Sequence, residues 1–333
     1  MAVCEAVRDF GLECEPMGLH GLDLARLLER VQRDPPDLVF NLCESLNGDT
    51  RNEMVVPAVL DMLRVPYTGP GPLTIGLCLD KDRAKQTLLQ HGVDTPAHVV
   101  VRDLVELDDP AHPFGSRPVR PSRARRASPE RLAHAQFVKL LREDASIGIE
   151  ASNLVMDREA LCRRAGELMR EHRQPVLIER YIDGREVNVT VLGNGEGARV
   201  LPLHEIDFGR MPAGRPRVLT YAAKWDENHV DYIGTVPVPM VGVPVSVEAA
   251  IRRAALTSFH ALGLRDYGRV DLRLDGSGRP WVIDVNPNCD LSPDAGLPRT
   301  AASIGLDYPQ VMGHICELAW KRHVADHPRT PTR

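Results

Sequence analysis

The residues with the clearest chemistry in this sequence are three oxygen donors within residues 268–286, namely Asp271, Asp284 and Asn286. Apolar and polar residues alternate on both sides of a short glycine-containing loop, which predicts a β-hairpin with one apolar and one polar face. In the register we expect, Asp271 lies opposite Val282, and Asp284 is one diagonal step away on the polar face. Carboxylate and amide oxygens without His or Cys suit Mg²⁺, which often completes its shell with substrate phosphates. The hairpin therefore predicts a magnesium site beside a nucleotide.

The same hairpin has a second explanation. Arg269 and Arg273 alternate with Asp271 on one strand and face Asp284 on the other, so these residues also fit a solvated surface with cross-strand ion pairs. The hairpin alone favours neither explanation, and residues elsewhere in the chain must decide between them.

Two lysines and a loop of small residues have the chemistry to bind phosphate. Lys139 lies in the apolar segment 137–141, where a solvated lysine is unusual, and a loop with Ser146 and Gly148 follows it. Backbone N–H groups of such a loop and a lysine ammonium suit the β- and γ-phosphates of a nucleotide. Lys224 is a further candidate, which closes over the γ-phosphate. Each lysine also has a simpler explanation. Lys139 could be a lone lysine on an edge strand, and Lys224 could be a solvated surface residue.

Four residues around a turn between two expected strands suit a nucleoside. Tyr181 and Ile182 offer apolar side chains to an adenine, and the backbone after Glu179 can hydrogen-bond the edge of the base. Glu186 has the carboxylate that accepts ribose hydroxyls in other nucleotide-binding folds. Exposed carboxylates beside a glycine turn are common, so this pattern is weak in isolation.

Helices and strands alternate along the first part of the chain, which predicts an α/β fold. The apolar segment 37–42 has the length and composition of a buried parallel strand, and residues 12–16 are expected to form a short strand. The chain opens on a helix at residues 2–10, so we expect a truncated parallel-sheet domain that lacks its first strand. Further helices are expected at residues 22–33, 53–63, 79–91, 157–171, 247–262 and 308–323, and further strands at residues 95–101, 137–141, 175–182 and 186–191.

Residues 103–134 interrupt this alternation. Pro, Ser and Arg are crowded into residues 117–126, a composition that cannot build a hydrophobic core. A basic arm that binds RNA is one explanation, but we favour a disordered insertion in a loop.

Composition limits the class of protein. The chain has 333 residues and a formal net charge of -5, with acidic and basic residues mixed along it, so nucleic acid is not expected as a partner. Its seven cysteines form no Cys-x-x-Cys pair, which argues against a disulfide framework and a zinc site. The sequence has no apolar run long enough to cross a membrane and no secretion signal, so we expect a cytoplasmic protein that acts on small molecules.

Nine short motifs occur in an order that resembles the ATP-grasp superfamily, and within it the D-alanine:D-alanine ligase type. In chain order they are Asp37-Leu-Val-Phe-Asn-Leu42, Pro66-Tyr-Thr-Gly69, Asp80-Lys81, Val138-Lys139, Ser146-Ile-Gly148, Glu179-x-Tyr-Ile-x-Gly-Arg-Glu186, Ala223-Lys224, Arg269-Val-Asp271 and Asp284-Val-Asn286. The resemblance implies an ATP-grasp fold with three domains: an N-terminal α/β domain at residues 1–78, a central lobe at 79–175 and a C-terminal catalytic domain at 176–333.

The resemblance also implies a reaction and its residues. ATP and two Mg²⁺ ions, with Mn²⁺ as an alternative, are expected between the central and C-terminal domains. A substrate carboxylate attacks the γ-phosphate to give an acyl phosphate, and an amine then displaces phosphate, which makes the chain a carboxylate-amine ligase. The implied ATP-binding residues are Lys81, Lys139, Ser146, Gly148, Glu179, Tyr181, Ile182 and Glu186, the implied metal ligands are Asp271, Asp284 and Asn286, and the implied catalytic residues are Lys224 and Arg269.

Residues 287–294 depart from the family pattern. Asp290 takes the place of a glycine that helps to bind the acceptor's carboxylate, and a carboxylate there repels another one. Asp284 replaces the usual glutamate, and Leu140 replaces a proline. Together with Asp294, Asp290 favours an amino acid or a cationic amine as acceptor, and the use of D-alanine stays open. A nucleotide-binding protein without ligase activity is the alternative, and the oligomeric state, including a homodimer, also stays open.

Overall fold

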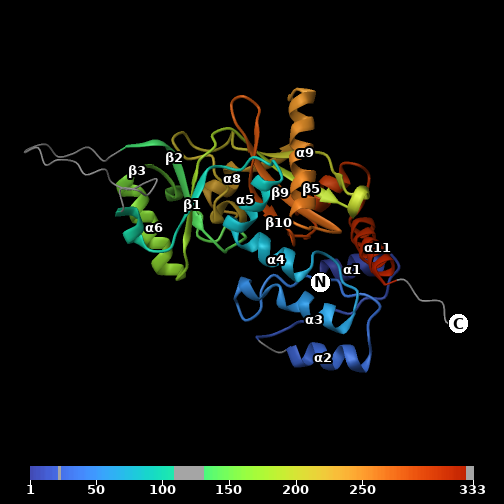
Figure 1. Cartoon of the computed structure of the whole chain (residues 1–333). Helices are drawn as coiled ribbons and strands as arrows, with labels where there is room; N and C mark the ends of the chain where they lie inside the picture. Colours follow the sequence, from blue (N-terminus) through green and yellow to red (C-terminus); the bar gives the residue numbers. More distant parts are fainter. Residues whose placement is uncertain (22–23, 109–130, 328–333) are drawn as a thin grey trace, which may run out of the picture.

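The computed structural model describes residues 1–21, 24–108 and 131–327, and within these ranges it contains two antiparallel sheets (Figure 1). The first sheet has the strand order β1-β4-β2-β3. Its strands are β1 (His98–Val101), β2 (Arg131–Leu140), β3 (Leu154–Asp157) and β4 (Val176–Arg180). The second sheet has the order β10-β9-β5-β7-β8, and β6 pairs with β5. Its strands are β5 (Arg185–Leu192), β6 (Arg199–Val200), β7 (His204–Asp207), β8 (Val236–Pro239), β9 (Tyr267–Leu274) and β10 (Pro280–Asn286).

Helix α6 (Arg158–His172) packs against one face of the first sheet. Val138 of β2 and Ile178 of β4 are fully buried in a cluster with the apolar side of this helix. Because side chains alternate along a strand, Lys139 and Glu179 point from the opposite face. The apolar residues of these strands thereby fix the direction of two charged ones.

Helix α9 (Val245–Ala261) covers one face of the second sheet. Val187 of β5 and Leu272 of β9 pack against it in the largest buried cluster of the described residues. Alternation then places Glu186 and Asp271 on the other face of this sheet. Both sheets therefore have one face that packs on a helix and one face with charged side chains.

The N-terminal part of the chain is mainly helical, and α1 packs against the C-terminal helix α11 (Figure 1). The predicted strand at residues 37–42 is wrong, because it is reduced to one parallel bridge between Val39 and Tyr67, and Leu42 is 49% exposed. Residues 12–16 likewise form no strand. The helices of this part are α1 (Ala2–Asp9), α2 (Leu24–Arg33), η1 (Thr50–Asn52), α3 (Val55–Leu63), α4 (Pro72–Leu79) and α5 (Lys81–Gln90).

The longer predicted helices at residues 157–171, 247–262 and 308–323 are confirmed as α6, α9 and α11. None of the helices in the described ranges is long and apolar enough to cross a membrane. The remaining helices are η2 (Leu104–Asp108), η3 (Ala151–Asn153), η4 (Gly195–Gly197), α7 (Tyr221–Trp225), α8 (Val230–Gly234), α10 (Gly296–Ala302) and α11 (Tyr308–Asp326).

The predicted insertion at residues 103–134 is too wide at both ends. Leu107 of η2 is 1% exposed and belongs to the core of the first sheet, and β2 already begins at Arg131. Residues 109–130 lie outside the described residues. Strand β4 pairs with β1 and β2, so it belongs to the first sheet, although the predicted boundary at residue 176 assigned it to the C-terminal domain. The domain bounds otherwise stay a prediction.

An ion pair between Asp266, before β9, and Arg322 of α11 connects the second sheet to the N-terminal part of the chain through hydrogen bonds to its backbone. Asp266 is 0% exposed and lies 2.9 Å from Nη2 of Arg322, which belongs to α11. The same carboxylate accepts hydrogen bonds from the backbone N–H of Gly69 at 2.9 Å and from Nδ2 of Asn194 at 2.8 Å. Arg322 also donates to the carbonyl oxygen of Tyr67 at 2.8 Å. One carboxylate thus connects three separate segments.

Candidate active site

A cavity of about 110 Å³ lies between the charged faces of the two sheets. It is lined by every predicted site residue except Gly148. These residues come from both sheets, from α5, from α7 and from the loop after β2, so the fold brings together distant parts of the sequence. The predicted residues at the cavity are Lys81, Lys139, Ser146, Glu179, Tyr181, Ile182, Glu186, Lys224, Arg269, Asp271, Asp284 and Asn286.

The two carboxylates of the hairpin lie directly opposite each other. The register of β9 and β10 shifts at a β-bulge between Val282 and Asp284, so that Asp284 pairs with Asp271. The predicted register, with Asp271 opposite Val282, is wrong, and Val282 joins the hydrophobic core at 1% exposure. Nδ2 of Asn286 donates to Asp271 at 3.0 Å. The bulge brings the three oxygen-bearing side chains closer together than the predicted register did.

Asp271 is surrounded by hydrogen-bond donors. Nε and Nη2 of Arg269 bind its two oxygens at 2.7 and 2.9 Å, and Nδ2 of Asn188 donates to it at 2.8 Å. Burial disfavours the charge on Arg269, but the adjacent Asp271 outweighs burial and raises the pKa of the guanidinium above its usual range. Asp271 is 9% exposed, and its ion pair runs along β9 rather than across the hairpin. The explanation as a solvated face with cross-strand pairs is therefore wrong.

Lys81 lies between two carboxylates. Its Nζ is 3.2 Å from Asp144 and 3.2 Å from Asp284. Burial disfavours the charge on Asp284, but Lys81 and Lys139 outweigh it and hold the pKa of this carboxyl below its usual range. Nζ of Lys139 donates to the carbonyl oxygen of Ile283 at 3.1 Å, next to the same carboxylate. Asp284 thus stays ionised because two ammonium groups surround it.

Lys139 and Lys85 hold one carboxylate between them. Their Nζ atoms lie 2.8 and 2.9 Å from Glu179, and Lys85 also donates to Oγ1 of Thr95 at 2.7 Å. Lys139 is on an inner strand and is 5% exposed, so it is not a lysine on an edge strand. Burial lowers the pKa of Lys85 to about 8. Lys85 is not among the predicted site residues, and the one signal in the sequence is its spacing of one helical turn from Lys81.

Gly148 is the predicted residue that the structure leaves outside the cavity. Its φ is +71°, and a Cβ there would lie 3.0 Å from Cδ1 of Leu140 and 3.1 Å from Cδ2 of Leu168. The backbone conformation and the core packing therefore both favour glycine here, and its contact with a phosphate stays a prediction. Ser146 of the same loop does line the cavity, and its Oγ donates to the carbonyl oxygen of Leu219 at 3.3 Å.

Lys224 has no hydrogen bond or ion pair within the part of the chain that the structure describes. It lines the cavity from α7, and burial together with the nearby Arg269 lowers its pKa. Helix α7 is placed beside the loop after β2 because the N–H of Tyr221 donates to the carbonyl oxygen of Ile149 at 2.9 Å. The ammonium group of Lys224 is consequently available to an anion in the cavity.

The predicted nucleoside end of the cavity combines an apolar wall with a buried carboxylate. Ile182 is 5% and Glu186 is 6% exposed, and burial raises the pKa of Glu186. Nη1 of Arg273 lies 2.7 Å from Oε2 of Glu186, and the guanidinium lies 4.8 Å from the ring centroid of Tyr181. Arg273 is not among the predicted site residues, because nothing in the sequence shows which carboxylate it would contact.

The segment beyond the hairpin contacts the N-terminal part of the chain. Oη of Tyr267 donates to Asn288 at 2.8 Å, and Nδ2 of Asn288 donates to Glu53 at 3.0 Å. Burial raises the pKa of Glu53 to about 8. Asp290, two residues further along, is exposed. The predicted acceptor residues Asp290 and Asp294 are thus both exposed, whereas the nearby Glu53 is buried.

Replacing Glu53 with glutamine should change how the stability of the fold depends on pH. A raised pKa means that this group stabilises the fold below the unfolded pKa of about 4.5 and that the contribution is lost as the pH rises towards 8. Relative to Glu53→Gln, the free energy of unfolding of the wild type should fall by up to about 5 kcal/mol between about pH 5 and 8. Urea unfolding at several pH values measures it, and a difference that stays constant across this range would contradict the expected burial effect.

The donor set of the hairpin fits magnesium bound together with phosphates. Among the described residues, no group of three or more His, Cys, Asp or Glu side chains is arranged to hold a metal by itself. Asp271, Asp284 and Asn286 offer two carboxylates and an amide, and Mg²⁺ commonly takes one or two carboxylates and fills its shell with water and phosphate oxygens. Lys139 on the facing sheet, Lys81 on α5 and Lys224 on α7 place positive charge in the same cavity, where such phosphates would lie.

Two antiparallel sheets whose charged faces enclose one cavity are the architecture of the ATP-grasp class of protein. The family described as "D-ala D-ala ligase C-terminus" matches residues 117–317. The D-alanine–D-alanine ligase of Bordetella pertussis is 31% identical over 306 residues, which cover 90% of this chain and 86% of that protein. The chain therefore belongs to the D-alanine–D-alanine ligase family, and the predicted ATP-dependent ligase that forms C–N bonds is confirmed at this level.

Two further proteins are similar over most of the chain. The uncharacterized protein y4sG of Sinorhizobium fredii is 33% identical over 311 residues, which cover 90% of this chain and 81% of that protein. A crystal structure of D-alanine–D-alanine ligase from Bacillus anthracis complexed with ATP has a TM-score of 0.68 at 21% identity, and the match covers 92% of this chain and 86% of that one. The predicted ATP-grasp fold is thereby confirmed.

Proposed function

We propose that the chain binds ATP and two Mg²⁺ ions in this cavity and joins a carboxylate to an amine through an acyl phosphate. The observation that carries the proposal is that Lys81, Lys139, Asp271 and Asp284 line one cavity, where Lys81 lies 3.2 Å from Asp284. Phosphoryl transfer depends on fixed positive charge and metal ions around the transferred group, and this arrangement supplies ligands for both. The similar Bacillus anthracis ligase was crystallised with ATP, which supports ATP as the nucleotide.

Four cationic residues of the cavity have a proposed role. Lys224 is assigned to the γ-phosphate, because its ammonium has no partner within the described residues. Lys81 and Lys139 are assigned to the other phosphate oxygens. Arg269 is held in one orientation by two bonds to Asp271, so we assign it to the acyl group at which charge develops.

The base and the metals have their own proposed ligands. The base is assigned to the backbone and side chains of residues 179–182, and the ribose to Glu186. Asp271, Asp284 and Asn286 would hold two Mg²⁺ ions, or Mn²⁺ in their place, and the ions would neutralise charge on the transferred phosphoryl group.

The proposed reaction has two displacement steps. An oxygen of the substrate carboxylate attacks the γ-phosphorus and ADP leaves, which gives the acyl phosphate. The amine nitrogen then attacks the acyl carbon, phosphate leaves, and the nitrogen loses a proton as the amide forms. The protein contributes mainly the positions of the reactants and fixed positive charge.

The acceptor is proposed to be an amino acid or a cationic amine. Exposed Asp290, together with Asp294, supports a positively charged group on this substrate, because a carboxylate repels another carboxylate and attracts an ammonium. A homodimer and a cytoplasmic location stay predictions.

Phosphate release from ATP tests the proposal directly. The purified protein is incubated with ATP, Mg²⁺ and pairs taken from a panel of carboxylates and amines that includes D-alanine, other amino acids and diamines. At least one pair should stimulate phosphate release, and mass spectrometry should find an amide that contains both substrates. ATP binding without stimulation by any pair would favour a nucleotide-binding protein without ligase activity.

A further inference from the structure

Arg273 uses all five N–H groups of its guanidinium in hydrogen bonds, although it is 4% exposed. Its acceptors belong to three parts of the cavity wall: the turn between β4 and β5, the strand β5, and the loop between β7 and α7. The bonds are Nε to the carbonyl oxygen of Ile182 at 2.6 Å, Nη1 to Oε2 of Glu186 at 2.7 Å and to the carbonyl oxygen of Arg217 at 3.0 Å, and Nη2 to Oη of Tyr181 at 3.1 Å and to the carbonyl oxygen of Gly184 at 3.0 Å.

Glu186 is held by one of its two oxygens. Oε2 accepts the bond from Arg273, whereas Oε1 has no hydrogen-bond partner within the described residues. The strands β5 and β9 pair Glu186 with Arg273, so the two side chains leave the sheet side by side. A carboxylate fixed through one oxygen keeps the other in a constant position, where it can accept hydrogen bonds from a ligand.

We infer that Arg273 is a positioning residue that fixes Glu186 for the ribose hydroxyls of the nucleotide and thereby sets the preference for ATP over 2′-deoxy-ATP. This inference rests on the proposed function, because it assigns the ribose to Glu186. The planar fork of arginine can serve the carboxylate and the surrounding carbonyl oxygens at the same time. A methionine at the position has a similar length but no donor, and a lysine has a single ammonium group that cannot reach all five acceptors.

The dissociation constants of ATP and 2′-deoxy-ATP, measured by calorimetry in Mg²⁺, test the inference. The wild type should prefer ATP by about tenfold or more, since a hydrogen bond to a charged group has about this effect. Arg273→Met should bring the preference to within about twofold, and Glu186→Gln should do the same. The preference of Arg273→Lys for ATP should be intermediate between that of the wild type and that of Arg273→Met.

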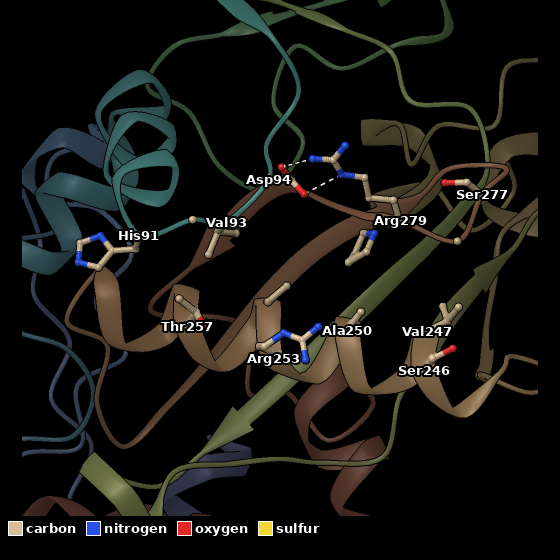
Figure 2. Close-up of a pocket in the computed structure, with 14 residues that line it drawn as sticks. His91, Val93, Asp94, Ser246, Val247, Ala250, Arg253, Thr257, Ser277 and Arg279 are labelled. Atoms are coloured by element: carbon tan, nitrogen blue, oxygen red, sulfur yellow. Dashed lines mark hydrogen bonds and ion pairs between the residues drawn. The ribbon is translucent and has the colours of Figure 1, made fainter.

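Arg279→Met is the matched control. Arg279 precedes β10 in the same hairpin, but it lies in a groove beside α9 and binds Asp94 through two nitrogens (Figure 2). This variant should keep the wild-type preference for ATP. A loss of preference in Arg279→Met as well would mean that any lost arginine of the hairpin has this effect, which would overturn the inference.

Other outcomes separate the inference from the proposed function. An Arg273→Met protein that keeps the wild-type preference overturns the inference, and if this variant fails to fold, an unchanged preference in Arg273→Lys does so. A wild type that ligates its substrates but binds both nucleotides equally overturns the role of Arg273 and leaves the ligase intact. A wild type that binds neither nucleotide overturns the proposed function itself.

Discussion

Replacing Asp271 with asparagine should lower the rate of ligation by at least about 10³-fold, because the change removes a carboxylate that we propose as a metal ligand and leaves Arg269 without its counter-charge. Asparagine has the same shape and can still accept from Asn188, so the fold should persist. Phosphate release with the best substrate pair measures the rate. Because Asp271 is proposed to bind the metals and not the base, the affinity for ATP without Mg²⁺ should change little.

Asp207→Asn is a matched control for this prediction. Asp207 ends β7 in the same sheet, is exposed, and is not part of the cavity wall. The control should keep nearly the full rate. Full activity of Asp271→Asn would remove the basis for placing the metals at the hairpin.

Replacing Asp266 with asparagine should lower the free energy of unfolding by about 3–5 kcal/mol, because it leaves the partly buried cation of Arg322 without its counter-charge. The φ of Asp266 is +63°, and asparagine tolerates this left-handed conformation as well as aspartate does. A loss of stability would therefore come from the charge and the hydrogen bonds, not from the backbone. Urea unfolding measures it.

A double-mutant cycle with Arg322, the partner of Asp266, checks this prediction. Asp266→Asn combined with Arg322→Gln should cost less than the sum of the two single changes, because the second change removes the unpaired cation. Additive effects, or a loss below about 1 kcal/mol for Asp266→Asn, would show that the pair does not hold the N-terminal part in place.

The sequence predicted the oxygen donors of the hairpin because strict alternation is a local property. It did not predict that Asp284 pairs with Asp271, since the β-bulge before Asp284 is a feature of the backbone that the alternation of side chains does not reveal. The sequence predicted Gly148 beside the phosphates, but it did not reveal that a positive φ and the nearby Leu140 also favour glycine there.

Residues whose roles depend on partners far away in the sequence could not be predicted. Lys85 and Arg273 bind Glu179 and Glu186, and only the packing of the sheets and α5 brings these pairs together. The predicted strand at residues 37–42 failed for a related reason. Its apolar residues have the composition of a buried strand, but the described chain offers it only one bridge, and strands form through pairing rather than composition alone.

The ion pairs of the hairpin carboxylates have a consequence for folding, which precedes the binding of any ligand. Each of these carboxylates has a cation of its own within the chain, Asp271 in Arg269 and Asp284 in Lys81. Two like charges on facing strands would otherwise repel each other. In a newly synthesised chain, the side chains of Arg269 and Lys81 therefore neutralise these carboxylates, and this face of the sheet can fold before a metal ion binds.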